Sequence, residues 1–137
     1  MSGQAQMPPM IDWAALEQAA RKARANAHAP YSGFPVGAAV LADGSIHAGC
    51  NVENASYPVG LCAERAALAA AVAAGARGIE AVLVVAGRPT SPCGMCRQAL
   101  AEFGAAVPVR LVGDEGAIET DLAVLLPTPF LSGDLCR

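Results

Sequence analysis

The chain has 137 residues, which is enough for one compact domain and too few for two. Apolar residues make up 54% of the sequence but aromatic residues only 4%, so the core must be built from Ala, Val and Leu. Charged residues, at 15%, are too few for a disordered chain, and the net charge of −3 argues against nucleic acid as a partner. So little charge on a small domain also indicates that another subunit covers part of the apolar surface.

Residues 1–10 are expected to form a flexible arm, and residues 11–137 a single domain. The start of the chain shows no basic, apolar leader pattern, and the longest low-charge helical stretch, residues 66–74, is too short to cross a membrane. We therefore expect a cytoplasmic protein with no membrane partner. Thiols stay reduced in the cytosol, so the five cysteines are expected to be metal ligands or bystanders rather than a disulfide framework.

Helical and strand patterns alternate along the chain. In chain order we expect a helix over 12–27, strands over 36–41 and 46–51, a helix over 61–74, a strand over 82–86, a helix over 93–103, strands over 109–112 and 117–120, and a short helix near 121–126.

Capping, turn and helix-breaking residues set the boundaries of these predicted elements. Asp12 is a suitable N-cap for the first helix, and Pro30 prevents that helix from continuing. The Asp43-Gly44 pair predicts a hairpin turn, and Gly75 closes the second helix. Proline at position 92 precedes the third helix, where a first-turn proline belongs.

The order of elements predicts a three-layer α/β fold, with one mixed five-stranded sheet and helices on both faces. Only about four residues join the last two strands, so these strands must be antiparallel. The sequence contains no internal repeat and no linker between domains.

Three cysteines stand at helix starts. Cys93 and Cys96 form a C-x-x-C motif that opens the third helix, and Cys62 opens the second. Free N–H groups at a helix N-terminus favour thiolates over thiols. If the two helices pack side by side, the three sulfur atoms can converge on one Zn²⁺. Tetrahedral zinc would then keep one open position, which is typical of a catalytic site.

Other interpretations of the cysteines remain open. The C-x-x-C motif could be a redox pair. Cys50 could be a fourth ligand that closes a structural site, although it lies in or beside a strand while the other three open helices. Otherwise Cys50 is a small buried residue and Cys136 a tail residue.

Glu64 lies two residues after Cys62 in the second helix, and Arg65 follows it. A carboxylate in a first helical turn is ordinarily a solvated partner of the helix dipole, and an arginine is ordinarily a surface charge. Beside a zinc-bound water, Glu64 could instead transfer protons between the water and a substrate. Arg65 could donate hydrogen bonds to the thiolates and restore Lewis acidity to the metal.

These residues resemble the zinc signature of the cytidine deaminases in two segments, Cys62-Ala-Glu64-Arg65 and Pro92-Cys93-Gly-Met-Cys96-Arg97-Gln98. Cysteine as the first ligand is similar to the small, homotetrameric class of that family. Further segments that resemble the family are 29–39, 49–57 and 125–130, and the resemblance extends over roughly residues 12–135.

The resemblance implies an enzyme that hydrolyses cytidine and 2′-deoxycytidine to the uridine nucleosides and ammonia. It implies one Zn²⁺ per subunit on Cys62, Cys93 and Cys96, with Glu64 as the proton shuttle. It also implies substrate contacts from several further positions. Asn51 and Glu53 would bind the ribose 3′-hydroxyl, Phe34 would stack on the pyrimidine, and the Ala63 N–H and the Ser91 carbonyl would bind base edges. Phe130, and with it Ala55 and Tyr57, would reach into a neighbouring subunit's site.

Several alternatives remain. A related deaminase could act on a nucleoside antibiotic such as blasticidin S, on a free base or on a polynucleotide. The net charge of −3 and the terminal hairpin disfavour a polynucleotide, and the Asn51–Glu53 pair disfavours a free base, which has no ribose. A non-catalytic, zinc-stabilised module would require a fourth protein ligand.

Overall fold

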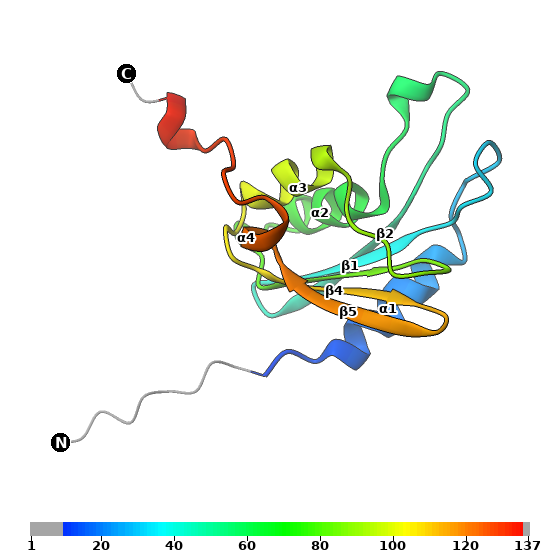
Figure 1. Cartoon of the computed structure of the whole chain (residues 1–137), viewed down its shortest axis with the longest axis horizontal. Coiled ribbons are helices and arrows are strands. Elements are labelled where there is room, and N and C mark those ends of the chain that lie inside the picture. The colour runs from blue at the N-terminus through cyan, green and yellow to red at the C-terminus, as the bar shows by residue number, and fades with distance from the viewer. Residues whose placement is uncertain (1–9, 136–137) are drawn as a thin grey trace.

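A mixed sheet flanked by helices organises the chain in this computed structural model, which describes residues 10–135 (Figure 1). The flexible arm predicted for residues 1–10 lies outside the described residues except for Met10, and so does Cys136. The elements are α1 (Trp13–Arg24), β1 (Gly37–Ala42), β2 (Ser45–Cys50), the 3₁₀ helix η1 (Tyr57–Val59), α2 (Ala63–Ala73), β3 (Ala81–Val85), α3 (Gly94–Ala101), β4 (Pro108–Gly113), β5 (Gly116–Asp121), α4 (Leu122–Leu125) and the 3₁₀ helix η2 (Ser132–Leu135).

The five strands form one sheet in the order β2-β1-β3-β4-β5. The β3–β4 pair is parallel, while β1 pairs antiparallel with β2 and β3, and β4 pairs antiparallel with β5. The Asp43-Gly44 turn joins β1 to β2, and both of its residues have positive φ values, 50° and 80°. The predicted mixed sheet and its antiparallel last pair are confirmed.

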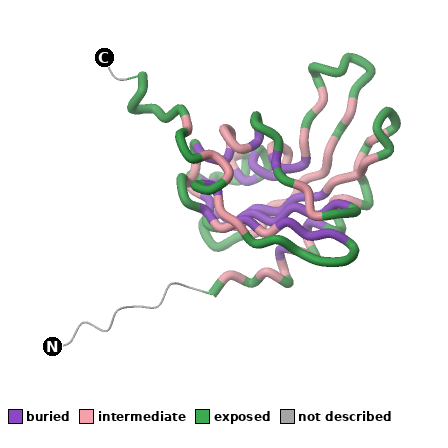
Figure 2. Tube along the Cα trace, in the orientation of Figure 1, coloured by how far each residue is buried: buried purple, intermediate pink, exposed green. Residues whose placement is uncertain are grey.

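Helices cover both faces of the sheet (Figure 1). On one face, Leu16 and Ala20 of α1 pack in a cluster with Leu83. On the other face, α2 and α3 supply Ala67 and Leu100 to a second cluster, which includes the residues of β3 that alternate with Leu83. The central strand β3 is buried along its whole length, as Figure 2 shows for the middle of the sheet. The predicted three-layer arrangement is therefore confirmed.

The second helix packs closely against β2 because Gly49 has no side chain. A Cβ atom at Gly49 would lie 2.5 Å from the backbone nitrogen of Ala67 and 2.7 Å from the Cβ of Ala66. Such a short distance leaves room only for hydrogen. This contact sets the height of α2, and hence of the residues at its N-terminus, above the sheet.

The first helix ends earlier than predicted, at Arg24 instead of residue 27. The residues after Arg24 form tighter turns, and the His28 N–H then donates to the carbonyl of Asn51. His28 also forms a β-bridge with Val52, and Val52 bridges to Leu61. Because these partners lie far away in the sequence, local periodicity does not show where the chain leaves the helix.

The same region contains the 3₁₀ helix η1, which lies between the strand predicted over 46–51 and the helix predicted over 61–74. Its first turn contains a proline, which suits a helix start. None of the helices within residues 10–135 combines the length and apolar character needed to cross a membrane.

Candidate metal centre and active site

The three predicted ligand sulfurs lie together at the N-terminal ends of α2 and α3. Cys62 is the N-cap of α2, Cys93 is the N-cap of α3, and Cys96 lies in the first turn of α3. All three Sγ atoms lie within 4.8 Å of one another, and the Cys62 and Cys93 sulfurs are 3.8 Å apart. The predicted convergence of the two helix starts is confirmed.

Packing of the two helices on one face of the sheet brings these starts together (Figure 1). Ala63 and Ala67 of α2 and Leu100 of α3 are fully buried in the same cluster. Small alanine side chains let α2 lie close to β1 and β2. The Ala-rich composition therefore has a direct structural use at this site.

The cysteine cluster fits a zinc ion. Thiolates lie about 2.3 Å from zinc, so two ligands of a tetrahedral ion are about 3.8 Å apart. The Cys62–Cys93 distance of 3.8 Å agrees with this value. Within the described part of the chain, no fourth His, Cys, Asp or Glu joins the group, and Cys50, at the end of β2, is not a member. The protein thus supplies three ligands, the number found in catalytic zinc sites.

Hydrogen bonds within the cluster favour the thiolate form of Cys62. The pKa of Cys62 is lowered to about 5, first by its hydrogen bond with Cys96 and further by the Arg65 guanidinium. Arg65 donates from Nη2 to the Cys62 sulfur over 3.6 Å. The same thiol pair raises the pKa of Cys96, which is also buried. Arg65 thus contacts the cluster, and its positive charge lies beside the Cys62 sulfur.

Glu64 is a buried carboxyl group beside the cysteines. It is the second residue of α2, and only 5% of its surface is exposed. Burial, and secondarily the charge on Cys62, raises its pKa above the ordinary value. A carboxyl group whose neutral form is stabilised in this way holds a proton more readily than an exposed one, which suits a group that must both accept and release protons.

A pocket of about 250 Å³ opens beside Glu64. Residues from both helix starts, from the end of β2 and from the 31–36 loop form its walls. Eight of the predicted site residues line it: Phe34, Asn51, Glu53, Cys62, Ala63, Glu64, Ser91 and Cys93.

Glu53 holds the loop that precedes the pocket. Its carboxylate accepts hydrogen bonds from the N–H groups of Tyr31 (2.9 Å) and Ser32 (3.1 Å), and from the Ser32 hydroxyl. The Ser32 hydroxyl bond is the largest of the effects that lower the pKa of Glu53. The Ser32 oxygen in turn accepts from the N–H of Phe34 (3.0 Å). The sequence analysis missed Ser32, although a serine two residues before Phe34 is a recognisable turn pattern.

Asn51 holds the other side of Phe34. Its side-chain amide donates to the Phe34 carbonyl and accepts from the Val36 N–H, each over 2.9 Å. The two residues predicted to bind ribose therefore also fix the backbone around the residue predicted to stack on the base.

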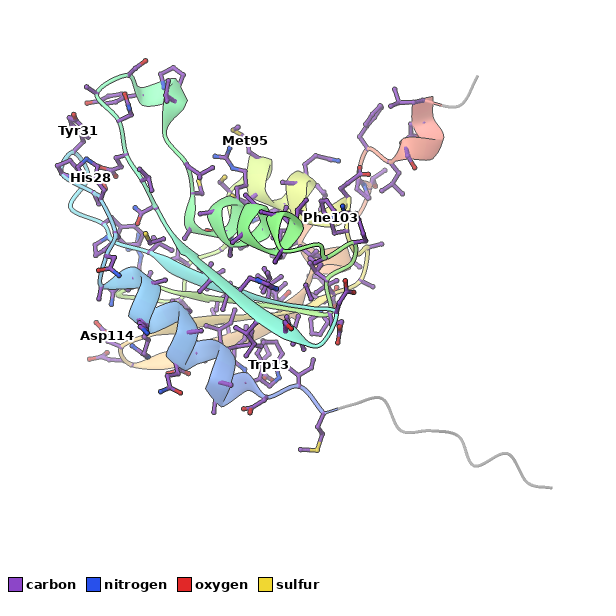
Figure 3. All side chains as sticks on the ribbon, turned by 180° about the vertical axis from the view of Figure 1, so that it is seen from behind. Trp13, His28, Tyr31, Met95, Phe103 and Asp114 are labelled. Carbon is purple, nitrogen blue, oxygen red and sulfur yellow. The ribbon has the colours of Figure 1, made fainter. Side chains whose placement is uncertain are left out.

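Three residues predicted to contact the substrate lie outside this pocket. Tyr57 is 74% exposed and Phe130 57% exposed, and Ala55 is also exposed. Tyr57 stacks edge-on against Tyr31, with ring centroids 5.8 Å apart, and both line a second pocket of about 370 Å³. Figure 3 labels Tyr31 on the loop that projects beyond the sheet. Within one chain, then, these three residues are not part of the pocket that contains Glu64.

Arg97 is a further site residue to which the sequence analysis gave no role. Its guanidinium donates to the Pro92 carbonyl (2.8 Å), to the Ser91 hydroxyl (2.9 Å) and to the Leu125 carbonyl (2.7 Å). These bonds fix the segment just before Cys93. The carbonyl partner in the C-terminal segment is distant in sequence, so no local pattern could reveal it.

Comparisons with known proteins agree with this geometry. The family model "Cytidine and deoxycytidylate deaminase zinc-binding region" matches residues 11–111. A cytidine deaminase from Sporosarcina psychrophila is 52% identical over 120 residues, which cover 84% of this chain and 88% of that protein. A cytidine deaminase from Mycobacterium tuberculosis strain H37Rv is 42% identical over 132 residues, 94% of this chain and 97% of that protein.

A solved structure shows the same fold. The crystal structure of cytidine deaminase from Burkholderia pseudomallei matches with a TM-score of 0.82 and 46% sequence identity, covering 88% of this chain and 100% of that chain. The segment that the family model matches includes the cysteine cluster and Glu64. The chain therefore belongs to the cytidine and deoxycytidylate deaminase family.

Proposed function

We propose that the protein hydrolyses cytidine and 2′-deoxycytidine to uridine and 2′-deoxyuridine with release of ammonia, as a step in pyrimidine salvage. One observation carries this proposal: the buried carboxyl group of Glu64 and the cluster of three cysteines lie together at one pocket of about 250 Å³. The relatives named cytidine deaminase support the choice of substrate.

The thiolates of Cys62, Cys93 and Cys96 would hold one Zn²⁺ per subunit. When bound, Zn²⁺ supplies the Lewis acidity that makes water a nucleophile near neutral pH. Three thiolates leave the ion with a net negative charge, which weakens that acidity. Arg65, which donates to the Cys62 sulfur, would draw charge from the thiolates and so counter this weakening.

Glu64 would carry the protons. Its carboxylate takes a proton from water and delivers it to N3 of the cytosine ring, which makes C4 electrophilic. After addition of hydroxide to C4, the same carboxyl group moves a second proton to the exocyclic amino group. The C4–N bond then breaks, ammonia leaves, and the C4 carbonyl of uracil forms. The raised pKa of Glu64 suits a group that must exist in both protonation states during one turnover.

The remaining pocket residues would orient the nucleoside. The Ala63 N–H and the Ser91 carbonyl would bind the edge of the base, and Phe34 would stack on its face. Asn51 and Glu53 would bind the ribose 3′-hydroxyl. An ionised carboxylate accepts several hydrogen bonds, so Glu53 can hold Ser32 and a ribose hydroxyl together.

We further propose that residues 11–137 act as one catalytic domain within a cytoplasmic homotetramer. Phe130, Ala55 and Tyr57 would complete the site of a neighbouring subunit. Their exposure in the single chain supports this, as does the exposure of Val59 (66%) and of Met95 (65%), which Figure 3 labels. Thiol ligands need reducing conditions, which supports the cytoplasm.

A direct assay tests the proposed activity. Purified protein is incubated with cytidine, 2′-deoxycytidine and blasticidin S, and ammonia release is followed with and without a chelator. We expect release from both pyrimidine nucleosides, and loss of release with the chelator. Release from blasticidin S alone would instead assign a nucleoside-antibiotic deaminase, and no release from either nucleoside would overturn the proposal.

Two variants separate the residue roles. Glu64→Gln should keep its zinc and its fold but lose at least about 10²–10⁴-fold in turnover, since it can no longer transfer protons. Near-normal turnover would show that Glu64 is not the proton shuttle. Cys50→Ala should retain full zinc, because Cys50 is outside the cluster. Loss of zinc from that variant would favour a structural site.

A further inference from the structure

The side chain of Gln98, on helix α3, holds the backbone of Phe130 at two points. The Gln98 amide donates to the Phe130 carbonyl over 2.7 Å and accepts from the Phe130 N–H over 3.2 Å. One amide thus pairs with both backbone groups of one residue, as a neighbouring strand would. Such two-point pairing fixes the orientation of the backbone as well as its position.

This clamp, the pair of hydrogen bonds from the Gln98 side chain to the Phe130 backbone, joins segments that are 32 residues apart in the chain. Gln98 is half-buried in α3, two residues after Cys96. Phe130 lies in the segment between α4 and η2, which leaves the body of the molecule beside α3 (Figure 1). Arg97, the preceding residue, holds the same segment at the Leu125 carbonyl over 2.7 Å.

The clamp holds a backbone whose side chain points outward. Although its N–H and carbonyl are both paired, the side chain of Phe130 leaves the residue 57% exposed. An aromatic side chain that is presented on a fixed backbone loses less conformational freedom when it binds, so it binds with less entropic cost.

We propose that Gln98 is a positioning residue that presents the Phe130 ring to the active site of a neighbouring subunit. This inference rests on the proposed function, because it takes the Phe130 ring to contact nucleoside in that subunit. Gln98 itself touches no substrate. It acts through the Phe130 backbone, so its contribution to substrate binding depends on the presence of the phenyl ring.

A double-mutant cycle tests this dependence. Steady-state kinetics with cytidine are measured on zinc-loaded wild type, Gln98→Leu, Phe130→Ala and the double variant. We expect Gln98→Leu to raise KM by about threefold to tenfold with a smaller effect on kcat. In the Phe130→Ala background, where the backbone remains but the ring is gone, the same change should alter kcat/KM less than about twofold.

Thermal stability separates positioning from a purely structural role. Gln98→Leu removes the same two hydrogen bonds in both backgrounds, so it should lower Tm equally in both. Gln18→Leu, on the exposed side of α1, is the matched control and should leave KM unchanged. If Gln98→Leu does not assemble with zinc, Gln98→Glu takes its place in the cycle, because it keeps the acceptor for the Phe130 N–H.

Equal losses of kcat/KM from Gln98→Leu in both backgrounds would overturn the positioning role. An unchanged KM in Phe130→Ala would overturn it too, since there would be no ring contact to position. In both cases, wild-type activity on cytidine would leave the proposed function intact. An inactive wild type would instead remove the proposed function, so the two failures are distinguishable.

Discussion

Gly49→Ala should destabilise the protein by pushing α2 away from the sheet. The new Cβ would lie 2.5 Å from the Ala67 nitrogen and 2.7 Å from the Ala66 Cβ, whereas ordinary contacts are about 3.5–4.0 Å. The helix must therefore retreat by roughly 1 Å. Overpacking of this kind costs about 1–3 kcal/mol. For a chain of this length, the cost corresponds to a fall in Tm of roughly 3–10 °C.

The displacement should also reach the active site. The N-terminus of α2 holds Cys62 and Glu64, and a misplacement of about 1 Å in a catalytic group can lower activity about 100-fold. The assay is thermal unfolding by circular dichroism, with zinc content and kcat/KM measured on the same samples. The matched control is Gly116→Ala at the start of β5, where an added Cβ meets no atom within 4 Å. Equal Tm values for the two variants would refute the close-packing argument.

Three further perturbations test other parts of the molecule. Ser32→Ala removes the main hydrogen bond that lowers the pKa of Glu53, so the pKa of Glu53 should rise and cytidine affinity should begin to fall at a higher pH on acidification. NMR titration of the Glu53 carboxyl group measures this pKa, and an unchanged value would contradict the prediction. Removal of the metal with a chelator should abolish deamination and make the cluster thiols reactive toward a thiol reagent, and added Zn²⁺ should restore the activity and the protection of the thiols. Thiols that stay unreactive in the presence of the chelator would contradict metal ligation. Asp12→Ala removes the side-chain cap on the Ala15 N–H and should lower the free energy of unfolding by about 1 kcal/mol without changing kcat/KM. Urea unfolding and steady-state kinetics measure the two quantities, and an unchanged urea midpoint would contradict the stabilising role of the cap.

Local signals were sufficient for the order of elements. The Asp43-Gly44 turn adopts the positive φ values that the hairpin needs, and Gly75, with φ of 102°, follows the end of α2 as predicted. Contacts between distant segments set the boundaries that the sequence did not predict. The bridge of His28 to Val52 ends the first helix early, and its partner lies beyond the whole β1–β2 hairpin. No local pattern around His28 contains that information.

The metal centre was predictable because its chemistry is local. Each cysteine stands at or near a helix start that the sequence itself marks, and the structure packs both helices on one face of the sheet. The residues that hold the site in place were not predictable. Arg97 and Gln98 act on backbone atoms of the C-terminal segment, and any residue type could supply those atoms.

The dual role of Asn51 and Glu53 follows from the same reasoning. Family resemblance assigns both residues to the ribose, but in the structure their polar groups already bind the backbone from Tyr31 to Val36. Phe34 lies inside that span, so the residues proposed for the sugar also hold the residue proposed for the base. A substitution at Asn51 would therefore disturb stacking on the base as well as contact with the ribose. Because the two sides of the pocket share one hydrogen-bond network, discrimination between nucleosides and free bases cannot be divided into independent contributions from each side.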